Sequence, residues 1–520
     1  MVPDIINSEL YKKILGDQNI FNAIFCMESY IFDKGLLNIE ESVVLFDESG
    51  EVIEVIAKND LELSYKLADK HNVELIEKVI KACQQKLQLI FSSEENLFEA
   101  KVYFKLKNYD DEVLKFRPMH TARLIDLICM VSILNCLMYE DNDEEGKRNL
   151  SDLSKLVPHN FYGNIPSTNV QYLFHKWQTK YKEYTENVIE HCRSYQNNHN
   201  YLTEVCLDIK NFFPSISPKL LYNYIIEKLS VTYKDDLPAL KAAVTKLLFF
   251  KLEEDNIEPW KDCYYPDDFE TARVDLYMNC GIPQGLPQSY FFGNLCMIEV
   301  KNCLMKDEYF HGDSYFYVDD SVIYVQAELD ENSFKEKIKA LNEDLLKWCK
   351  KAESDKSDIG KFVPQTYLDF HAKLKYQIEF HKEGKSVFTL IDNTDNQFGP
   401  ILNLTRETSI SSGLSWNLDE IDDQVSLGKL EALDKVISRE IEEQKKKAKE
   451  NVGAEYKNEV SSRLKLLRRF KKFFLYRNRL LKIREEGGPN EVLLNSFIER
   501  FLEKMNNLTD WFEQNDKDIF

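Results

Sequence analysis

The chain has 520 residues, enough for two or three domains around sizeable cores, and its 43% hydrophobic and 30% charged content is ordinary for a globular protein. Its formal net charge of −21 by itself argues against a nucleic-acid partner. The eleven cysteines form no C-x-x-C pair and no His/Cys cluster, which favours reduced thiols in a cytosolic protein over a zinc site.

Membrane and export signals are weak. The N-terminal sequence MVPDIINSELYKK has no apolar signal-peptide core, so we expect no signal peptide. The most apolar helical stretch, 124–139, contains Asp126 and Asn135 and is short for a bilayer span, which predicts a core helix. We therefore expect a cytoplasmic protein that does not contact a membrane.

In chain order, residues 1–95 are predicted to be helices with one short hairpin, within LNIEESVVLFDESGEVIEVI. Alternating segments at 100–108 and 113–119, separated by YDDE, predict a β-hairpin whose second arm ends at Pro118. Five cations lie along its arms: Lys101, Lys105, Lys107, Lys115 and Arg117. They are typical of a phosphate-binding hairpin or of a charged surface ribbon.

The rest of the chain divides into three parts. Residues 160–200 are predicted to be helical, with lysines among Trp177, Tyr181 and Tyr184. From 203 to about 405 strands alternate with helices, and after Gly413 the sequence indicates charged amphipathic helices. These patterns predict an α+β fold with an all-helical C-terminal region.

Charge is unevenly distributed along the chain. Residues 463–484 carry ten Lys/Arg and no Asp/Glu among Leu, Phe and Tyr, typical of a single-strand track or of a helix face docked on an acidic neighbour. Acid concentrates in 140–145 and in 252–270. The second acidic segment is interpreted as a solvated loop, with repulsion of duplex DNA or a subunit contact as alternatives.

Two adjacent aspartates, Asp319 and Asp320, lie in the apolar stretch YFYVDDSVIYV, and a third, Asp208, ends the apolar strand in EVCLDIKNFFPSI. Burying like charges is costly unless a cation receives them. The pair is therefore a solvated turn or part of a metal site. If the two strands are neighbours, Asp208 and Asp319 can share two Mg²⁺ ions suited to phosphoryl transfer.

The segment GIPQGLPQSYFFGNL (281–295) lies between these aspartates. Gly281, Pro283 and Gly285 allow the backbone to approach a ligand closely at the start of a helix. Gln284 and Ser289 supply polar groups there.

D-x-x-x-F-F, P-Q-G-x-x-x-S and Y-x-D-D, in this order and spacing, resemble the palm of a reverse transcriptase over roughly residues 100–405. The resemblance implies that Asp208 and Asp319 hold two Mg²⁺ ions, supported by Asp320, and that Tyr317 lies beside the primer end. It places Phe213 under the sugar, where it excludes a 2′-OH, and Gln284 and Gly285 at the incoming deoxynucleotide.

The resemblance also implies roles outside the three motifs. Triphosphate ligands would come from the hairpin residues Lys105 or Lys107 and Lys115 or Arg117. Residues 377–391 resemble a downstream strand pair, in which Lys382 or Lys385 would protonate the pyrophosphate leaving group.

Features outside the palm indicate which class of reverse transcriptase the chain resembles. No RNase H constellation, maturase-like segment, or N-A-x-x-H and V-T-G elements follow the palm. DIKNFFPSI and LRRFKKFFLYR are similar to bacterial defence-associated reverse transcriptases, including the abortive-infection group, in which an all-α C-terminal domain replaces an ordinary thumb. The implied domains are 1–95, mainly helical; 96–200, fingers; 201–410, palm; and 411–520, all-helical.

This group implies homo-oligomers and DNA synthesis in antiphage defence, either protein-primed and template-independent or templated by an associated non-coding RNA. Partners would be dNTPs, single-stranded DNA and RNA. Tyr456 and Tyr476 are the candidate priming hydroxyls, with packing or base stacking as the alternative for Tyr476. A non-catalytic nucleic-acid or phage sensor is a rival that the intact motifs disfavour. An RNA-dependent RNA polymerase is another, disfavoured by Phe213.

Overall fold

A computed structural model describes residues 2–26, 41–47, 50–67, 72–110, 113–142, 147–198, 201–258, 261–266, 269, 276–354, 357–382 and 386–391. Helices and strands are mixed in it, which confirms the α+β class. The predicted C-terminal domain, the basic segment 463–484, and Tyr456 and Tyr476 lie outside the described residues. The predicted domain boundaries stay predictions.

The N-terminal part is helical with one hairpin, as predicted. Its elements are α1 (Val2–Ile6), α2 (Glu9–Leu15), α3 (Asp17–Cys26), β1 (Val43–Phe46), β2 (Val52–Ala57), α5 (Asp60–Leu67) and α6 (Val73–Ser92). These helices gather around α7 (Leu124–Met138), which is buried on every side. The prediction of a core helix at 124–139 is confirmed, because a helix apolar all round must be enclosed. Among the described helices, none combines the length and apolar character needed to cross a bilayer.

The predicted hairpin is present as β3 (Glu99–Asp110) and β4 (Val113–Thr121), with β8 (Lys251–Leu252) parallel to β3. Pro118 does not end the second arm as predicted, since β4 continues to Thr121. The sheet order β4-β3-β8 makes β4 an edge strand, and an edge strand tolerates a residue without a backbone N–H.

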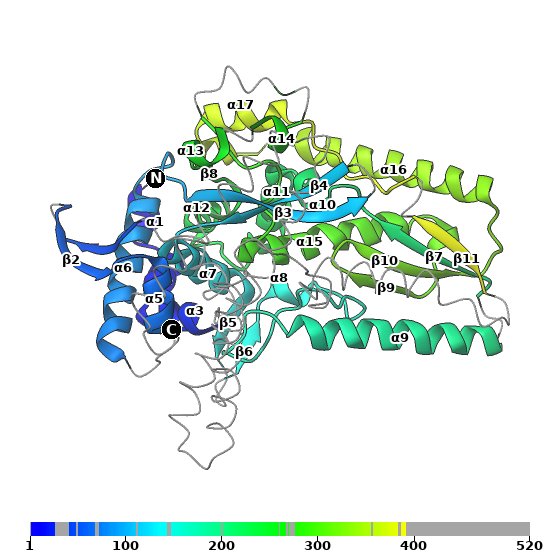
Figure 1. Ribbon diagram of the computed structural model, residues 1–520, viewed down its shortest axis with the longest axis horizontal. Coiled ribbons are helices and arrows are strands. Elements are labelled where there is room, and N and C mark those ends of the chain that lie inside the picture. The colour runs from blue at the N-terminus through cyan, green and yellow to red at the C-terminus, as the bar shows by residue number, and fades with distance from the viewer. Residues whose placement is uncertain are drawn as a thin grey trace, which may run out of the picture.

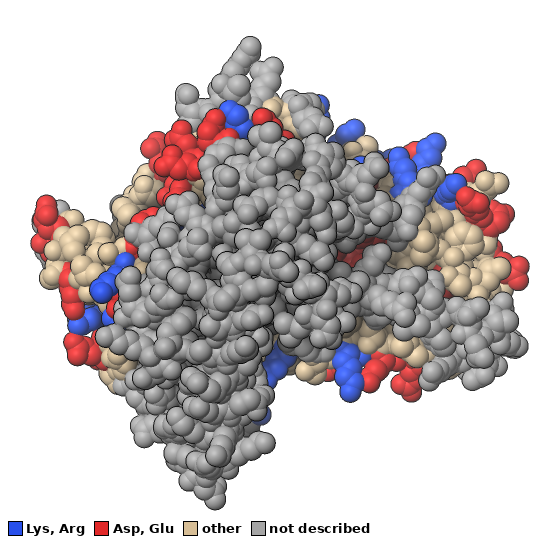
Figure 2. All heavy atoms as spheres, viewed as in Figure 1, with Lys and Arg blue, Asp and Glu red and all other residues tan. Residues whose placement is uncertain are grey.

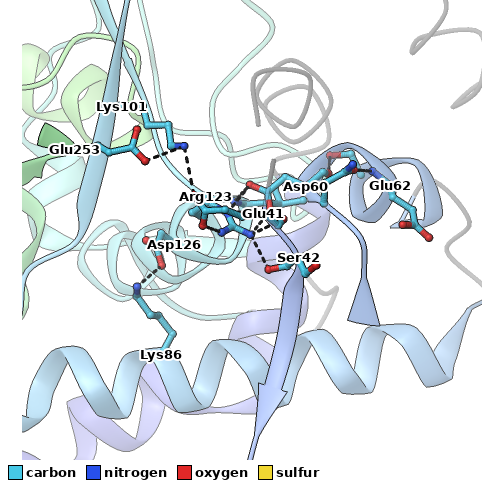
Figure 3. Close-up of polar contacts among 12 residues, drawn as sticks. Glu41, Ser42, Asp60, Glu62, Lys86, Lys101, Arg123, Asp126 and Glu253 are labelled. Carbon is cyan, nitrogen blue, oxygen red and sulfur yellow. Dashed lines mark hydrogen bonds and ion pairs between the residues drawn. The ribbon is translucent and has the colours of Figure 1, made fainter. Parts of the chain in front are cut away.

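An ion-pair network ties the hairpin base to the N-terminal part (Figure 3). Arg123, directly before α7, contacts the carboxylates of Glu41 and of Asp60, which is 1% exposed. Asp60 also accepts a 2.9 Å hydrogen bond from the Leu124 N–H and so caps α7 from a distant element. On β3, Lys101 pairs with Glu253 at 3.0 Å. Lys101 is therefore a structural anchor of the hairpin.

A four-stranded antiparallel sheet with the order β11-β7-β10-β9 forms the second half of the described chain. Its strands are β7 (Thr203–Asp208), β9 (Ser314–Tyr317), β10 (Asp320–Val325) and β11 (Val387–Leu390). Leu207, Phe316 and Ile323, on one face, belong to the main hydrophobic core together with α11, α15 and α16. Helix α9 covers the other face, so β7 is buried at all six positions instead of alternating.

The remaining elements connect these parts. They are β5 (Tyr139–Asn142), β6 (Arg148–Leu150), α8 (Asp152–Lys155), α9 (Trp177–Asn198), α10 (Phe212–Ser215), α11 (Pro218–Leu229), α12 (Leu237–Leu248), α13 (Glu254–Ile257), α14 (Lys261–Tyr264), α15 (Pro287–Leu304), η3 (Glu308–Phe310), α16 (Glu331–Ser354), η4 (Ile359–Lys361) and α17 (Gln365–Lys373). All ten cysteines whose side chains are described are buried free thiols, in agreement with the predicted reduced state.

Two sequence interpretations need correction. The segment 377–391 is not a strand pair: Phe380 bridges Ile209 and Val387 pairs with Cys206, so both pieces lie along the same edge of β7. The acidic segment 252–270 is a solvated loop only in part. Figure 2 shows acidic side chains gathered over α13, whereas Tyr264 and Tyr265 nearby are buried.

Candidate active site

The three motif aspartates meet at one end of the four-stranded sheet. The antiparallel register places Asp320 opposite Asp208 on β7 and opposite Tyr317 on β9. Directly opposed residues point to the same face with Cβ atoms about 4.5–5.5 Å apart. Asp319 lies in the two-residue turn beside them. Asp208 is only 8% exposed, so its carboxylate is largely withdrawn from water.

The turn Tyr317–Asp320, here called the aspartate turn, is strained. Val318 has φ of +57°, a left-handed conformation that β-branched residues rarely adopt. Two-residue hairpin turns need a positive φ at their first position, and a non-glycine residue there costs about 1–3 kcal/mol. The surrounding structure must therefore hold the turn in place.

The segment 160–164 supplies that support. The Tyr162 N–H donates to the Phe316 carbonyl at 2.9 Å, and the Phe316 N–H donates to the Asn160 carbonyl at 2.9 Å. A Cβ built on Gly163 would lie 2.6 Å from Val318 Cγ2 and 2.8 Å from the Val318 nitrogen. On α15, the Asn294 amide donates to the Gly163 carbonyl at 2.9 Å. Only glycine at 163 lets this backbone press against the aspartate turn.

A histidine that the sequence analysis missed lies beside Asp208. His381 Nε2 is 3.7 Å from Asp208 Oδ2, and the His381 N–H donates to the Asp208 carbonyl at 3.0 Å. The Asn342 side chain fixes this segment, because it exchanges hydrogen bonds with both backbone groups of Phe380. Of the two lysines predicted as leaving-group acids, Lys382 follows His381 and is exposed, and Lys385 lies outside the described residues.

The P-Q-G segment forms a second turn, here called the glutamine loop (residues 279–286). Gly281 and Gly285 have φ of +63° and +107°, which glycine adopts without strain. A Cβ on Gly281 would lie 2.4 Å from the Phe213 carbonyl oxygen, which accepts the Ile282 N–H at 3.0 Å. The loop therefore packs directly on the segment that follows Asp208.

Phe213 lies in α10 and is 5% exposed. Its ring meets Phe212 and Tyr290 edge-on, with centroids 5.2 Å and 6.2 Å apart. This position links the glutamine loop to the end of β7, so the structure brings Phe213, Gln284 and Gly285 into one region. Ser289 is fully buried there, and its hydroxyl has no hydrogen-bond partner among the residues that the structure describes.

The hairpin base reaches the glutamine loop through His120. The Gln284 carbonyl accepts the His120 N–H at 2.7 Å and His120 Nδ1–H at 3.1 Å. A carbonyl only accepts, which assigns the proton to Nδ1, so that Nε2 of the neutral ring accepts from the Tyr264 hydroxyl at 2.6 Å. That hydroxyl in turn accepts the Cys280 N–H at 3.0 Å. The acidic segment thus supplies a tyrosine that fixes the loop at both ends, which the sequence analysis did not predict.

The hairpin cations are placed by backbone register. Lys105 lies opposite Arg117 and Lys115 opposite Asn108, with Lys107 at an irregularity in the ladder. Arg117 is half-buried, three residues before His120, whereas the side chains of Lys105, Lys107 and Lys115 lie outside the described part. The register is consistent with these cations lying near the glutamine loop, but it does not identify which of them would contact a phosphate.

The negative charge of Asp320 affects the pKa values of two tyrosines on the α9 side of the sheet. Burial raises the pKa of Tyr184 and of Tyr317, and the Asp320 carboxylate adds to both shifts. Farther along the same face, burial raises the pKa of Glu204 to about 7, opposed by a hydrogen bond from the Tyr324 hydroxyl at 2.8 Å. The sheet face that carries Asp208 and Asp320 is therefore polar but largely shielded from water.

The donor set suits magnesium. Carboxylate oxygens are the ligands that this hard cation prefers, and it is usually held by one or two carboxylates with water and phosphate oxygens completing the shell. Within the part of the chain that the structure describes, no three His, Cys, Asp or Glu side chains gather as a ready metal cage. Asp208 and Asp320, opposite each other in the register, and Asp319 in the turn beside them are the carboxylates that would hold such an ion, with substrate phosphates completing its shell.

No protein-family model matches the chain, and a search of curated proteins finds no similar sequence.

Proposed function

We propose that the protein is a Mg²⁺-dependent, reverse-transcriptase-like DNA polymerase with palm and fingers regions. The observation that supports this most is the meeting of Asp208, Asp319 and Asp320 at one end of an antiparallel sheet, beside a glycine-lined loop. Paired metal ions in such a site would stabilise the attacking and leaving oxygens of an in-line phosphoryl displacement.

The chain's own residues would bind and orient the reactants. Asp208 and Asp319 would hold the metal, and Asp320, opposite Asp208 in the register, would support the site. Gln284 and Gly285 would line the nucleotide site in a position that His120 and Tyr264 fix. Catalysis of this kind needs positioning and charge neutralisation more than a covalent nucleophile.

The biological role belongs to the same proposal. The D-x-x-x-F-F context and the tail sequence LRRFKKFFLYR support a place among bacterial antiphage reverse transcriptases that act as homo-oligomers in the cytoplasm. Synthesis would be protein-primed and template-independent, or else templated by an associated RNA. A non-catalytic sensor is the alternative, which the intact aspartate turn and its support by Gly163 disfavour.

The test is incorporation of labelled deoxynucleotides by purified, nuclease-treated protein with Mg²⁺, alone and with co-purified RNA, on denaturing gels before and after protease. We expect incorporation that Asp208→Asn and Asp319→Asn abolish. The control Asp344→Asn, on α16 with a side chain 48% exposed, is expected to leave activity unchanged. Near-normal activity in either site variant would refute the assignment of Asp208 and Asp319 as metal ligands. If the wild-type protein incorporates no nucleotide either alone or with co-purified RNA, the non-catalytic sensor is the function that remains. Label that shifts on proteolysis would identify a protein primer.

A further inference from the structure

Helix α9 lies along the sheet face that carries Asp208, Asp320 and Tyr317 (Figure 1). Its residues Tyr184, Val188, Cys192 and Tyr195 are buried in one cluster with Cys206, Tyr315, Val322 and Tyr324 of the sheet. A nucleic-acid strand whose end lies at the aspartate turn therefore cannot continue across this face of the sheet. The part of α9 that contacts the aspartate turn is its N-terminal end, through Tyr181 and Tyr184.

That end of the helix carries an aromatic stripe. Trp177, Tyr181 and Tyr184 lie at i, i+4 and i+7, and so on one side of the helix. Their exposure falls toward the site: Trp177 is 46% exposed, Tyr181 is intermediate and Tyr184 is 5% exposed. The stripe thus runs from solvent into the candidate active site.

The buried end of the stripe contacts the aspartate turn. The Tyr181 ring meets the Tyr317 ring edge-on, with centroids 5.0 Å apart, and Tyr184 lies 5.6 Å from the same ring. Tyr317 is register-paired with Asp320. A base beside the carboxylates would therefore meet Tyr317 and Tyr181 before it met Trp177.

Cations flank the stripe, although acids partly offset them. Lys176 is exposed and lies 5.2 Å from the Tyr172 ring, and Lys180 pairs with Glu183 at 2.6 Å. Lysines outnumber acids three to two over residues 176–186. Exposed aromatics with only a modest positive charge favour base stacking over phosphate attraction as the main contact.

We propose that the first two turns of α9 are a platform for the terminal bases of the single strand being extended, with Tyr181 and Trp177 stacking on successive bases. Lys176 and Lys180 lie beside the backbone of that strand. This inference rests on the proposed polymerase function and deepens it by naming the strand-binding element and its ligand, an unpaired DNA 3′ end.

The test is fluorescence anisotropy of a labelled oligodeoxythymidine and of a blunt duplex of the same length, with purified full-length protein. Tyr181→Ala and Trp177→Ala are each expected to weaken single-strand binding roughly 5- to 150-fold, as loss of one base stack does. Tyr181→Phe keeps the ring and should bind as wild type. The control Phe46→Ala removes an aromatic ring that is 42% exposed on the distant strand β1.

Wild-type single-strand affinity in both alanine variants would overturn the inference, as would equal losses for single strand and duplex. So would a wild-type protein that binds no single strand. Asp319→Asn separates the two proposals: it is expected to bind the oligonucleotide normally and to incorporate nothing. If wild-type protein incorporates nucleotides while both alanine variants bind the single strand normally, the platform fails and the polymerase proposal stands.

Discussion

Gly163→Ala is expected to displace the aspartate turn without touching a carboxylate. The added methyl would lie 2.6 Å from Val318 Cγ2 and 2.8 Å from the Val318 nitrogen, whereas ordinary contact begins near 3.4 Å. A side chain can rotate away from the first contact. The second involves backbone, so the turn and the 160–164 segment must separate by roughly 0.6 Å, the shortfall from ordinary contact.

The magnitude follows from that shift. A 1 Å misplacement of reacting groups can cost about 100-fold in rate, so we expect kcat to fall roughly 10- to 100-fold. Overpacking at such a contact costs about 1–3 kcal/mol of unfolding free energy. The variant should therefore be folded and slow.

Single-turnover nucleotide incorporation measures the rate, and urea unfolding checks the fold. Gly360→Ala is the matched control, because a Cβ there meets only Leu368 Cδ1 at 3.8 Å. The control should retain the wild-type rate. A folded Gly163→Ala variant with the wild-type rate would refute the view that residues 160–164 hold the turn.

Three further changes test other parts of the site. Phe213→Ala is expected to admit ribonucleotides because the sugar pocket then tolerates a 2′-OH. Loss of the buried ring should lower the unfolding free energy by about 3–5 kcal/mol. An unchanged ratio of kcat/KM for deoxynucleotides and ribonucleotides would dismiss the role. Tyr264→Phe removes the hydroxyl that forms hydrogen bonds with His120 and Cys280. The variant should raise KM for dNTP more than it lowers kcat, and should lose about 1–3 kcal/mol of unfolding free energy. A wild-type KM would contradict this expectation. Burial raises the pKa of Glu204 from 4.5 to about 7. The neutral carboxyl therefore contributes its full share of the unfolding free energy below pH 4.5. That contribution, on the order of 3 kcal/mol, is lost as pH rises through about 7. Glu204→Gln should remove this loss in urea unfolding compared at about pH 5 and about pH 8, and equal pH dependence in both proteins would contradict the assignment.

The sequence predicts local features of the site because they depend on short-range patterns. A two-residue turn between β-branched strands sets the register of its own hairpin, which places Asp320 beside Tyr317. The run of apolar residues ending in Asp208 predicts a buried strand, and the two strands are indeed neighbours. Glycines 281 and 285 do have positive φ values and close backbone contacts, but these contacts are with the backbone at Phe213 and His120; close approach to a ligand stays a prediction.

Contacts between distant elements were not predictable in the same way. Tyr264 belongs to an acidic segment whose composition indicates solvent exposure, and its burial depends on contacts with His120 and Cys280. His381 has no motif of its own and is placed by pairing of its backbone with β7. The position of α9 over the sheet follows from which side of a helix is apolar, and periodicity alone does not name the partner of that side.

The shared metal site is tested most directly by Mn²⁺ titration of the wild-type protein with a non-reactive deoxynucleotide triphosphate analogue, followed by electron paramagnetic resonance. We expect two Mn²⁺ per chain with magnetic coupling between ions about 4 Å apart, and loss of the coupling in Asp208→Asn and in Asp319→Asn. Nucleotide-bound Mn²⁺ alone, with the same spectrum in wild type and both variants, would contradict it.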